Sequence, residues 1–194
     1  INFSVAAFFG LGAYGTALMS SSDAPVLGNF PPILGLFFGL ALAGILAVLI
    51  GIPTLNLRED YLAIASLGLA EVVRLVVTNE GQWTGGAVGL SGIPRFFEGW
   101  PLLGNLSRGV PTAAANLLLV STFVVVTYLF LRRVHRSPWG RVQRTIRADE
   151  DLAKALGKDT YRFKMESFVL GSMVMALAGV FFAHLQLYLS PGVM

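Results

Sequence analysis

The sequence contains no cysteine and few charged residues, and each shortage excludes a class of protein. Without cysteine, neither a disulfide framework nor a thiolate metal site can form. Charged residues make up 13% of the chain, about half of the roughly 25% that is usual in soluble domains. A soluble domain of 194 residues would still need a wetted surface. Lipid as the outer solvent explains the deficit, together with a hydrophobic fraction of 55% and a mean hydropathy of +0.69.

Groups that carry catalysis are also scarce. The chain has two histidines, His135 and His184, and the topology derived below places them on opposite sides of a membrane, so they cannot share a metal ion. No serine has a histidine and an acid partner within plausible reach, and no Walker A pattern for ATP phosphates is present. We therefore predict that the chain is not an enzyme and holds no metal or cofactor, and that any ATP hydrolysis takes place on another chain.

Five segments are apolar over lengths that approach the roughly 20 residues needed to cross a bilayer. They are Phe3–Ser20, Pro32–Ile52, Tyr61–Thr78, Pro111–Leu131 and Met165–Leu189. This pattern predicts an all-α fold, a polytopic transmembrane helix bundle with about five spans. The chain starts without Met or the basic region of a signal peptide and stops soon after an apolar run. We therefore expect residues 1–194 to form a single transmembrane domain that is truncated at both ends.

The charges are distributed unevenly along the chain, and this sets the expected orientation. Ten of the fourteen Lys and Arg residues lie in residues 132–164, which carry a net charge of +6. Basic connections between spans stay in the cytoplasm, so alternation places residues 52–60 inside and residues 20–31 and 78–110 outside. Because the excess charge lies at one membrane edge, it indicates no nucleic-acid partner.

Small residues recur at the spacing of close helix contacts. Gly35, Gly39 and Ala43 lie four residues apart on the second span, a pattern that lets two backbones approach in lipid. Similar contact faces are expected in the first and fifth spans, at Gly10, Gly12, Gly171 and Gly179. Membrane helices are rich in glycine, so ordinary helix packing is the main interpretation of these residues.

A glycine-rich stretch, Thr84–Pro94, follows the third span. Each glycine costs about 1 kcal/mol relative to Ala within a helix, and four glycines in nine positions disfavour a regular helix. Irregular backbone survives at membrane depth only when it is buried in protein or lines a wet cavity. The stretch is therefore either a re-entrant or mouth element whose backbone meets a solute, or an ordinary external loop. Its candidate substrate-pathway residues are Thr84, Gly85, Gly86, Gly89, Ser91 and Gly92.

Two opposite charges interrupt the third span. Glu71 and Arg74 are three residues apart, which makes them neighbours on one helical face. Charges inside a span are costly, so an interior-facing pair that touches a passage is one interpretation. The other is structural: the two charges neutralise each other and attach the third span to its neighbours, with Arg74 close enough to the outer end to snorkel.

The basic segment has more organisation than a simple loop requires. Ser137 and Pro138 supply an N-cap and a proline at the first helical position, and Gly157 fits a helix stop. A modest apolar stripe is formed by Val142, Ile146, Ala153 and Leu156. We expect one long or two short cytoplasmic helices, which either lie on anionic lipid headgroups or dock a cytoplasmic partner. The acidic residues 149–151 favour docking, because a lipid-seeking surface gains nothing from three carboxylates.

Six blocks of the sequence occur in an order that resembles a known family. They are AAFFGLGAYGTAL (6–18), LREDYLAIASLGLAEVVRLV (57–76), TGGAVGLSGIP (84–94), SPWGR (137–141), IRADEDLAKALGKDTYRFK (146–164) and FVLGSMVMALAGVFFAHLQLYLSP (168–191). Together they resemble the membrane-spanning permease subunit of the branched-chain amino-acid ABC importers, of the type that pairs with a second, related permease. The resemblance covers nearly the whole chain, and chains of this family are longer at both ends.

This resemblance implies a heteromeric importer in a bacterial inner membrane. Its expected partners are cytoplasmic ATPase subunits, a second homologous permease subunit, an external solute-binding protein and membrane lipid. In such importers a cytoplasmic loop, here residues 132–164, carries a coupling helix that sits in a groove of the ATPase. The resemblance places that element at Ile146, Arg147, Asp149, Glu150, Ala153, Ala155, Leu156 and Gly157. The general loop motif begins Glu-Ala-Ala, whereas this chain reads Glu-Asp-Leu-Ala from Glu150, so the flanking residues carry the assignment.

Other functions are compatible with the same sequence. Related permeases carry urea, short amides or other amino acids, and the residues do not choose among these substrates. An ATP-independent secondary transporter or channel is a further alternative, as is a purely structural membrane subunit. An intramembrane cluster of carboxylates would favour the secondary transporter, and only Glu71 lies deep in a span.

Overall fold

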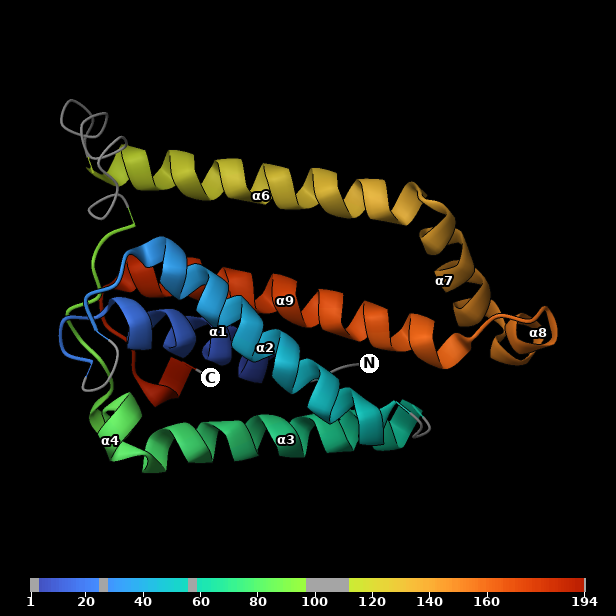
Figure 1. Ribbon diagram of the computed structural model, residues 1–194, viewed down its shortest axis with the longest axis horizontal. Coiled ribbons are helices and arrows are strands. Elements are labelled where there is room, and N and C mark those ends of the chain that lie inside the picture. The colour runs from blue at the N-terminus through green and yellow to red at the C-terminus, as the bar shows by residue number, and fades with distance from the viewer. Residues whose placement is uncertain (1–3, 25–27, 56–58, 97–111, 194) are drawn as a thin grey trace.

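The computed structural model describes residues 4–24, 28–55, 59–96 and 112–193, and its long elements are all helices (Figure 1). They are α1 (Val5–Ser20), α2 (Pro32–Thr54), α3 (Glu59–Asn79), α4 (Gly81–Thr84), α6 (Thr112–Arg136), α7 (Pro138–Ala148), α8 (Glu150–Ala155) and α9 (Thr160–Gln186), with the 3-10 turns η1 (Gly86–Val88) and η3 (Pro191–Val193). Within these residues the only β pairing is an isolated antiparallel bridge between Leu90 and Leu189. The predicted all-α bundle is confirmed.

Four of the helices are long and apolar enough to cross a bilayer. These spans are Pro32–Thr54, Tyr61–Asn79, Ala114–Arg136 and Thr160–Gln186, and α1 is a shorter apolar helix of 16 residues. Each predicted span therefore corresponds to a helix, and the chain is a multi-pass membrane protein. The structure extends α6 past the predicted end at Leu131 to Arg136, and it begins α9 at Thr160 rather than Met165. Both extensions carry charged residues, which the apolar pattern alone could not assign to a helix.

The short helix α1 lies at the centre of the bundle, packed against α2 and α9 (Figure 1). Small residues make this packing close: a Cβ on Gly15 would lie 2.7 Å from the Cα of Gly39, and one on Gly179 would lie 1.9 Å from the carbonyl oxygen of Phe9. The predicted contact face of Gly35, Gly39 and Ala43 is buried, as expected for helices held by backbone approach in lipid.

The expected contact faces on the other two helices are confirmed except at one position. Gly10 and Gly12 are buried in α1, and Gly179 is buried in α9. Gly171 has no described neighbour within 4 Å of an added Cβ, so it belongs to none of the contacts within the described bundle.

The helices α3 and α6 lie at the periphery, on opposite sides of this core (Figure 1). Only 6% of the apolar window of α6 and 11% of that of α3 is buried. Large apolar side chains such as Leu117, Tyr128 and Ile64 are therefore more than 60% exposed. In a membrane these faces meet lipid or other helices, which is consistent with the low charge of the chain.

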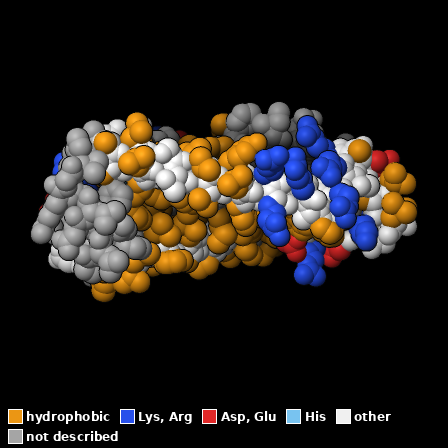
Figure 2. Space-filling view, turned by 90° about the horizontal axis from the view of Figure 1, so that it is seen from above, with side chains coloured by type: hydrophobic (Ala, Val, Ile, Leu, Met, Phe, Trp, Pro, Cys, Tyr) orange, Lys and Arg blue, Asp and Glu red, His pale blue; other side chains and the backbone are white. Residues whose placement is uncertain are grey.

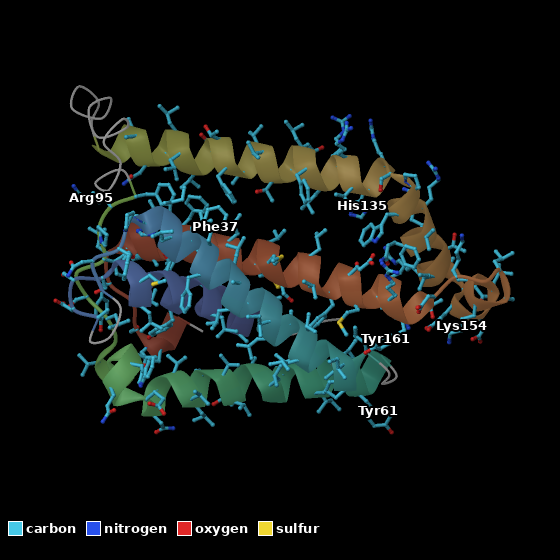
Figure 3. The ribbon with its side chains drawn as sticks, in the orientation of Figure 1. Phe37, Tyr61, Arg95, His135, Lys154 and Tyr161 are labelled. Atoms are coloured by element: carbon cyan, nitrogen blue, oxygen red, sulfur yellow. The ribbon has the colours of Figure 1, made fainter. Side chains whose placement is uncertain are left out.

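The bundle has two chemically different ends. One end carries α7 and α8 with most of the Lys and Arg side chains, which gather there in Figure 2. The opposite end carries α4 and the segments that connect α1 to α2 and that follow α9 (Figure 1). By the positive-inside rule we call the basic end the inner end and the opposite end the outer end. Figure 3 shows His135 and Lys154 toward the inner end and Arg95 at the outer end.

Candidate functional site

At the inner end the basic segment folds into two short helices separated by one extended residue. Ser137 caps α7, where its side chain accepts a hydrogen bond from the Gly140 N–H, and Pro138 occupies the first turn. Asp149 (φ −156°) interrupts the helix, and its carboxylate accepts bonds from the N–H groups of Asp151 (2.9 Å) and Leu152 (3.0 Å). Asp149 is therefore an N-cap, and the prediction of two short helices is confirmed over one long helix.

The end of α8 follows a standard C-terminal pattern. Gly157 has a φ of +74°, and its N–H donates to the carbonyl oxygen of Lys154 (2.9 Å) while the Lys158 N–H donates to that of Ala153 (3.1 Å). A left-handed residue with these bonds satisfies the last carbonyl groups of a helix. The predicted helix stop at Gly157 is confirmed.

Side chains tie this pair of helices to the base of α9. The indole Nε1 of Trp139 donates to the Glu166 carboxylate (2.7 Å), and Gln143 donates to the carbonyl oxygen of Phe163 (2.5 Å). Glu150 pairs with Lys164 on α9 and with Lys154 (3.2 Å) one turn along α8. The basic segment is thus held against the membrane-spanning helix α9 by side-chain contacts and not only by its covalent connection.

Glu150 is the centre of this attachment, and its surroundings change its acidity. The Lys164 ammonium, followed by Lys154, lowers the pKa of the Glu150 carboxyl, while burial opposes the shift. Thr160 at the start of α9 also donates to Glu150 (3.3 Å). At neutral pH the residue is a carboxylate that links α8 to α9.

The residues assigned to the coupling element divide into two groups. Ile146 and Ala153 are buried and face the helices behind them. The others, apart from the half-buried Glu150, are exposed: Arg147, Asp149, Ala155, Leu156 and Gly157. Leu152 was not among the predicted residues, yet it is 53% exposed and lies one turn from Leu156, which is 65% exposed. Two leucines four residues apart on an exposed helix form a small apolar face.

At the outer end the glycine-rich stretch is compact and covers the ends of α1 and α9. It begins at the last residue of α4, forms η1 and then becomes an extended run whose Leu90 exchanges two backbone hydrogen bonds with Leu189, both at 2.9 Å. Leu90 and Ile93 are buried in a cluster with Ala13, Tyr14, Ala17, Val77, Ala183 and Leu189. Thr84 is buried, and its hydroxyl contacts the carbonyl oxygens of Val77 and Glu80.

Left-handed backbone explains the glycines in this stretch. Positive φ angles occur at Gly85, Gly86, Gly89 and Gly92, and residues other than glycine rarely adopt them. At Gly89 there is also no space, because an added Cβ would lie 2.0 Å from the carbonyl oxygen of Leu189. The predicted absence of a regular helix over this stretch is confirmed.

A buried histidine joins α9, α1 and the end of the glycine-rich stretch. The Nδ1 of His184 lies 2.8 Å from the carbonyl oxygen of Pro94, and its Nε2 lies 3.1 Å from the Thr16 hydroxyl. A carbonyl oxygen only accepts, so Nδ1 carries a proton and donates it to Pro94. His184 therefore joins α9 to α1 and to the glycine-rich stretch. Nothing in the sequence pattern indicated this pairing.

The connection that follows α1 is fastened to the same stretch. The Ser21 hydroxyl donates to the carbonyl oxygen of Ser91 (2.5 Å), and the Ser22 N–H donates to that of Gly92 (3.1 Å). The Ser91 hydroxyl in turn donates to the carboxylate of Asp23. Asp23 was not predicted as a site residue; its only signal was an isolated acid after three serines on the outer side.

Glu71 and Arg74 form a bidentate ion pair on α3, with distances of 2.5 and 3.0 Å. Their side chains are 53% and 39% exposed, so they point away from the described bundle rather than into it. Mutual neutralisation is observed. Within the described part of the chain, no hydrogen bond or ion pair joins this pair to a neighbouring helix or to the glycine-rich stretch.

Comparison with known proteins agrees with this architecture. Residues 1–193 match the family model described as the permease component of the branched-chain amino acid transport system. The chain belongs to this permease family. It is 34% identical, over 95% of its length, to the high-affinity branched-chain amino acid transport system permease protein LivM of Escherichia coli (strain K12). It is 30% identical, over 91% of its length, to the probable branched-chain amino acid transport permease protein LivM of Methanocaldococcus jannaschii.

The match covers only part of these relatives. The permease-family chain spans 46% of the Escherichia coli protein and 51% of the Methanocaldococcus protein, about half of the length of each. No solved structure matches it.

The described residues of this permease-family chain offer no obvious metal site. No group of three or more His, Cys, Asp or Glu side chains is placed among them to hold an ion. What the geometry offers instead is an exposed two-helix element at one end, joined to α9 by side-chain contacts, and a compact glycine-lined surface at the other.

Proposed function

We propose that the chain is a transmembrane permease subunit of an ATP-driven ABC importer for branched-chain amino acids, in a bacterial inner membrane. The family match over residues 1–193 is the observation that carries the proposal. Residues 1–194 act as one permease domain, with residues 132–164 as its cytoplasmic coupling loop. The partners are cytoplasmic ATPase subunits, a second related permease, an external solute-binding protein and the surrounding lipid.

The coupling contact is the exposed face of α8. Leu152 and Leu156 supply an apolar surface at the tip of the inner end, and Arg147, Asp149, Ala155 and Gly157 surround it with small and charged groups. We propose that this face sits in a groove of the ATPase. Ile146 and Ala153, which are buried behind it, hold the face in place.

The attachments to α9 make this contact useful for transport. When the ATPase pair closes on ATP, it pushes on α8, and the Glu150–Lys164 and Trp139–Glu166 contacts pass the displacement to α9. Because α7 follows directly from α6, the same push tilts α6. Movement of these two spans opens the passage, which is alternating access with the energy supplied from the cytoplasmic side.

The solute path is proposed to run past the two remaining groups of candidate residues. Glu71 and Arg74 lie in the outer half of α3 and face outward, where lipid would solvate them poorly. A second permease chain packed on α3 would enclose the pair in a polar passage. Thr84, Gly85, Gly86, Gly89, Ser91 and Gly92 then lie at the external mouth of that passage.

Replacing the α8 leucines tests the coupling proposal. We expect the double variant Leu152→Asp/Leu156→Asp to lose at least about tenfold of leucine uptake and of ATPase stimulation by the binding protein, because the loss of about 1.4 kcal/mol of contact energy corresponds to that factor. The amount of permease in the membrane should not change, since both side chains are exposed. The matched control is Leu152→Met/Leu156→Met, which keeps the apolar face. Normal uptake by the aspartate variant would rule out this contact.

Uptake assays decide the substrate. Cells that lack the native system are given the full importer and tested with labelled leucine, urea and short amides. We expect leucine to accumulate in an ATP-dependent manner and the ATPase subunits to co-purify with the permease. Accumulation without ATP, or of urea or amides alone, would replace the proposal with one of its alternatives.

The pair on α3 is tested separately. We expect Glu71→Gln/Arg74→Gln to reduce uptake severalfold in correctly inserted protein if the pair lines the passage. Unchanged transport would leave Glu71 and Arg74 as a packing contact only.

A further inference from the structure

The outer end contains an open pocket, formed in part by residues of the proposed external mouth, to which no ligand chemistry has yet been assigned. Its volume is about 670 Å³, within the roughly 300–1,000 Å³ of small-molecule sites. Its walls come from the connection after α1, from α4 and from the glycine-rich stretch. The lining residues are Asp23, Gly81, Gln82, Trp83, Gly85, Gly89, Leu90 and Ser91.

Among the described residues that line the pocket, one is charged, and its charge is negative. Asp23 is the one ionisable side chain in this part of the lining, and no Lys, Arg or His is among the described residues there. A carboxylate accepts about four hydrogen bonds, so the bond from the Ser91 hydroxyl leaves it the capacity to accept others. The natural complement of such a group is a small cation with N–H donors.

The backbone at Asp23 is tied to the glycine-rich stretch, and the exposed carboxylate itself accepts from the Ser91 hydroxyl. The N–H of Asp23 donates to the Ser21 hydroxyl (3.1 Å), which itself donates to the carbonyl oxygen of Ser91. The approach is close, because a Cβ on Gly92 would lie 2.3 Å from the Ser22 hydroxyl oxygen. An ordered backbone at Asp23 and the bond from Ser91 reduce the conformational freedom that the carboxylate loses on binding a ligand.

The rest of the lining suits an apolar group. Trp83 is 49% exposed, and an indole packs aliphatic chains and attracts ammonium groups on its face. Gly81, Gly85 and Gly89 contribute no side chains, which leaves the space beside Asp23 and Trp83 open. The pocket therefore combines one acceptor for a cation with an aromatic surface for hydrocarbon.

We propose that this pocket is a binding site for a free amino acid. Asp23 accepts hydrogen bonds from the α-ammonium group, and Trp83 packs against the aliphatic side chain. The inference rests on the proposed function and names the chemistry of its outer site. The site is a station that the solute occupies after release from the binding protein and before it enters the passage.

Direct binding to the assembled importer tests this proposal. The full complex of both permeases and the ATPases is purified without the external binding protein and incubated with labelled leucine. We expect leucinamide, which keeps the ammonium group, to displace the label at least about tenfold better than 4-methylpentanoate, which lacks it. We expect Asp23→Asn to weaken leucine binding about tenfold. Ser91→Ala keeps the charge, so its loss of leucine binding should be several times smaller than that of Asp23→Asn.

The matched control is Glu80→Gln, which removes a second exposed carboxylate from the outer end without touching the pocket lining. It should bind leucine as the unmodified complex does. Equal binding by Asp23→Asn, no saturable binding at millimolar leucine, or equal competition by 4-methylpentanoate would each overturn the site. If Asp23→Asn instead loses cross-linking to the binding protein while leucine binding persists, the pocket is a protein-docking surface and the proposal fails.

Failure of this site is distinguishable from failure of the proposed function. The same complex, with its binding protein restored, is placed in vesicles and assayed for ATP-driven leucine uptake. Uptake that persists while the pocket binds nothing overturns the pocket alone. Absence of uptake of any amino acid by the unmodified complex overturns the proposed function. Should Asp23→Asn fail to assemble, Asp23→Glu and the competitor series on the unmodified complex give the same decision.

Discussion

The outer and inner ends of the bundle are held together by different kinds of contact. At the outer end, side-chain hydrogen bonds such as that of His184 are joined by close backbone contacts: Leu90 pairs with Leu189, and Gly89 lies where no side chain fits. At the inner end, side chains meet side chains, as in the Glu150–Lys164 ion pair and the Trp139–Glu166 hydrogen bond. The outer end is therefore sensitive to shape, and the inner end is sensitive to charge.

This difference matches the functions proposed for the two ends, contact with the ATPase at the inner end and solute binding at the outer end. A contact surface that is pushed by an ATPase must move with α9, and exposed ion pairs can break and re-form at a cost of at most about 1 kcal/mol each. A pocket that binds a small solute needs fixed geometry, which close backbone packing supplies. Substitutions that separate steric from electrostatic effects can test whether the two ends differ in this way.

The largest expected effect is that of Gly89→Ala at the outer end. The residue has a φ of +84°, and an added Cβ would lie 2.0 Å from the carbonyl oxygen of Leu189. The left-handed backbone alone costs an alanine about 1–2 kcal/mol, and crowding adds about 1–3 kcal/mol. We expect a clear drop in the unfolding temperature of the purified importer and loss of the Leu90–Leu189 pairing.

Gly81→Ala provides the control for Gly89→Ala. It lies nearby in α4, and no described atom is within 4 Å of its added Cβ. This variant should unfold at the normal temperature. Equal behaviour of the two variants would show that the outer end yields easily and is not fixed by its backbone.

The next largest effect is expected for His184→Leu. The change leaves the carbonyl oxygen of Pro94 and the hydroxyl of Thr16 without their partner, and an unsatisfied buried polar group costs about 1–3 kcal/mol. We expect reduced thermal stability and faster amide exchange in residues 90–93. His135→Leu is the control, because that histidine is exposed at the inner end. A similar loss in both variants would contradict a specific role for the buried ring.

The helices were predictable from sequence because their signals are local. Apolar runs set the spans, Ser137 and Pro138 set the start of α7, and Gly157 set the stop after α8. The pairing of Glu71 with Arg74 was predictable for the same reason, since three residues separate them. Their outward direction was not, because it depends on which face of α3 the rest of the bundle covers.

The contacts at the outer end were not predictable because they join distant parts of the chain. Thr16 and His184 are separated by 168 positions, and Asp23 and Ser91 by 68. Neither pair has a sequence pattern, since each depends on where α1 and α9 finish relative to the glycine-rich stretch. The candidate residues in that stretch were recognisable by their glycines, whereas the charged group that completes the pocket was not.

Gly157→Ala should have a smaller effect than Gly89→Ala, although both residues are left-handed. Gly157 has a φ of +74°, but no described atom lies within 4 Å of its added Cβ. The cost is therefore only about 1–2 kcal/mol, that of placing alanine in left-handed backbone. The change destabilises the C-terminal end of α8, which is the part of the helix that opens most easily. We expect faster amide exchange in α8 with a nearly unchanged unfolding temperature for the importer. A loss as large as that of Gly89→Ala would mean that α8 is packed as tightly as the outer end.

The smallest effect, and the one most specific to the inner end, is expected for Glu150→Gln. The variant removes the ion pairs with Lys164 and Lys154, which are exposed enough that their sum is about 1 kcal/mol or less. We expect the distance between spin labels on α8 and α9 to become more broadly distributed at pH 7. Asp151→Asn is the control, because the Asp151 side chain is 97% exposed and lies 3.9 Å from Lys154; its distance distribution should match that of the unmodified protein.

The lowered pKa of Glu150 predicts how the α8–α9 distance distribution changes with pH. Its pKa is lowered in the folded protein, chiefly by Lys164, so the unfolded state binds the proton more readily. The stabilisation is present above the unperturbed glutamate pKa of about 4.3 and is lost as the pH falls through the lower folded value. In the unmodified protein the α8–α9 distances should therefore broaden only below about pH 4.3, whereas Glu150→Gln should show that breadth already at pH 7 and change little on acidification. A Gln variant that kept a narrow distribution at pH 7 would show that Trp139 and Gln143 hold α7 and α8 to α9 without the charge.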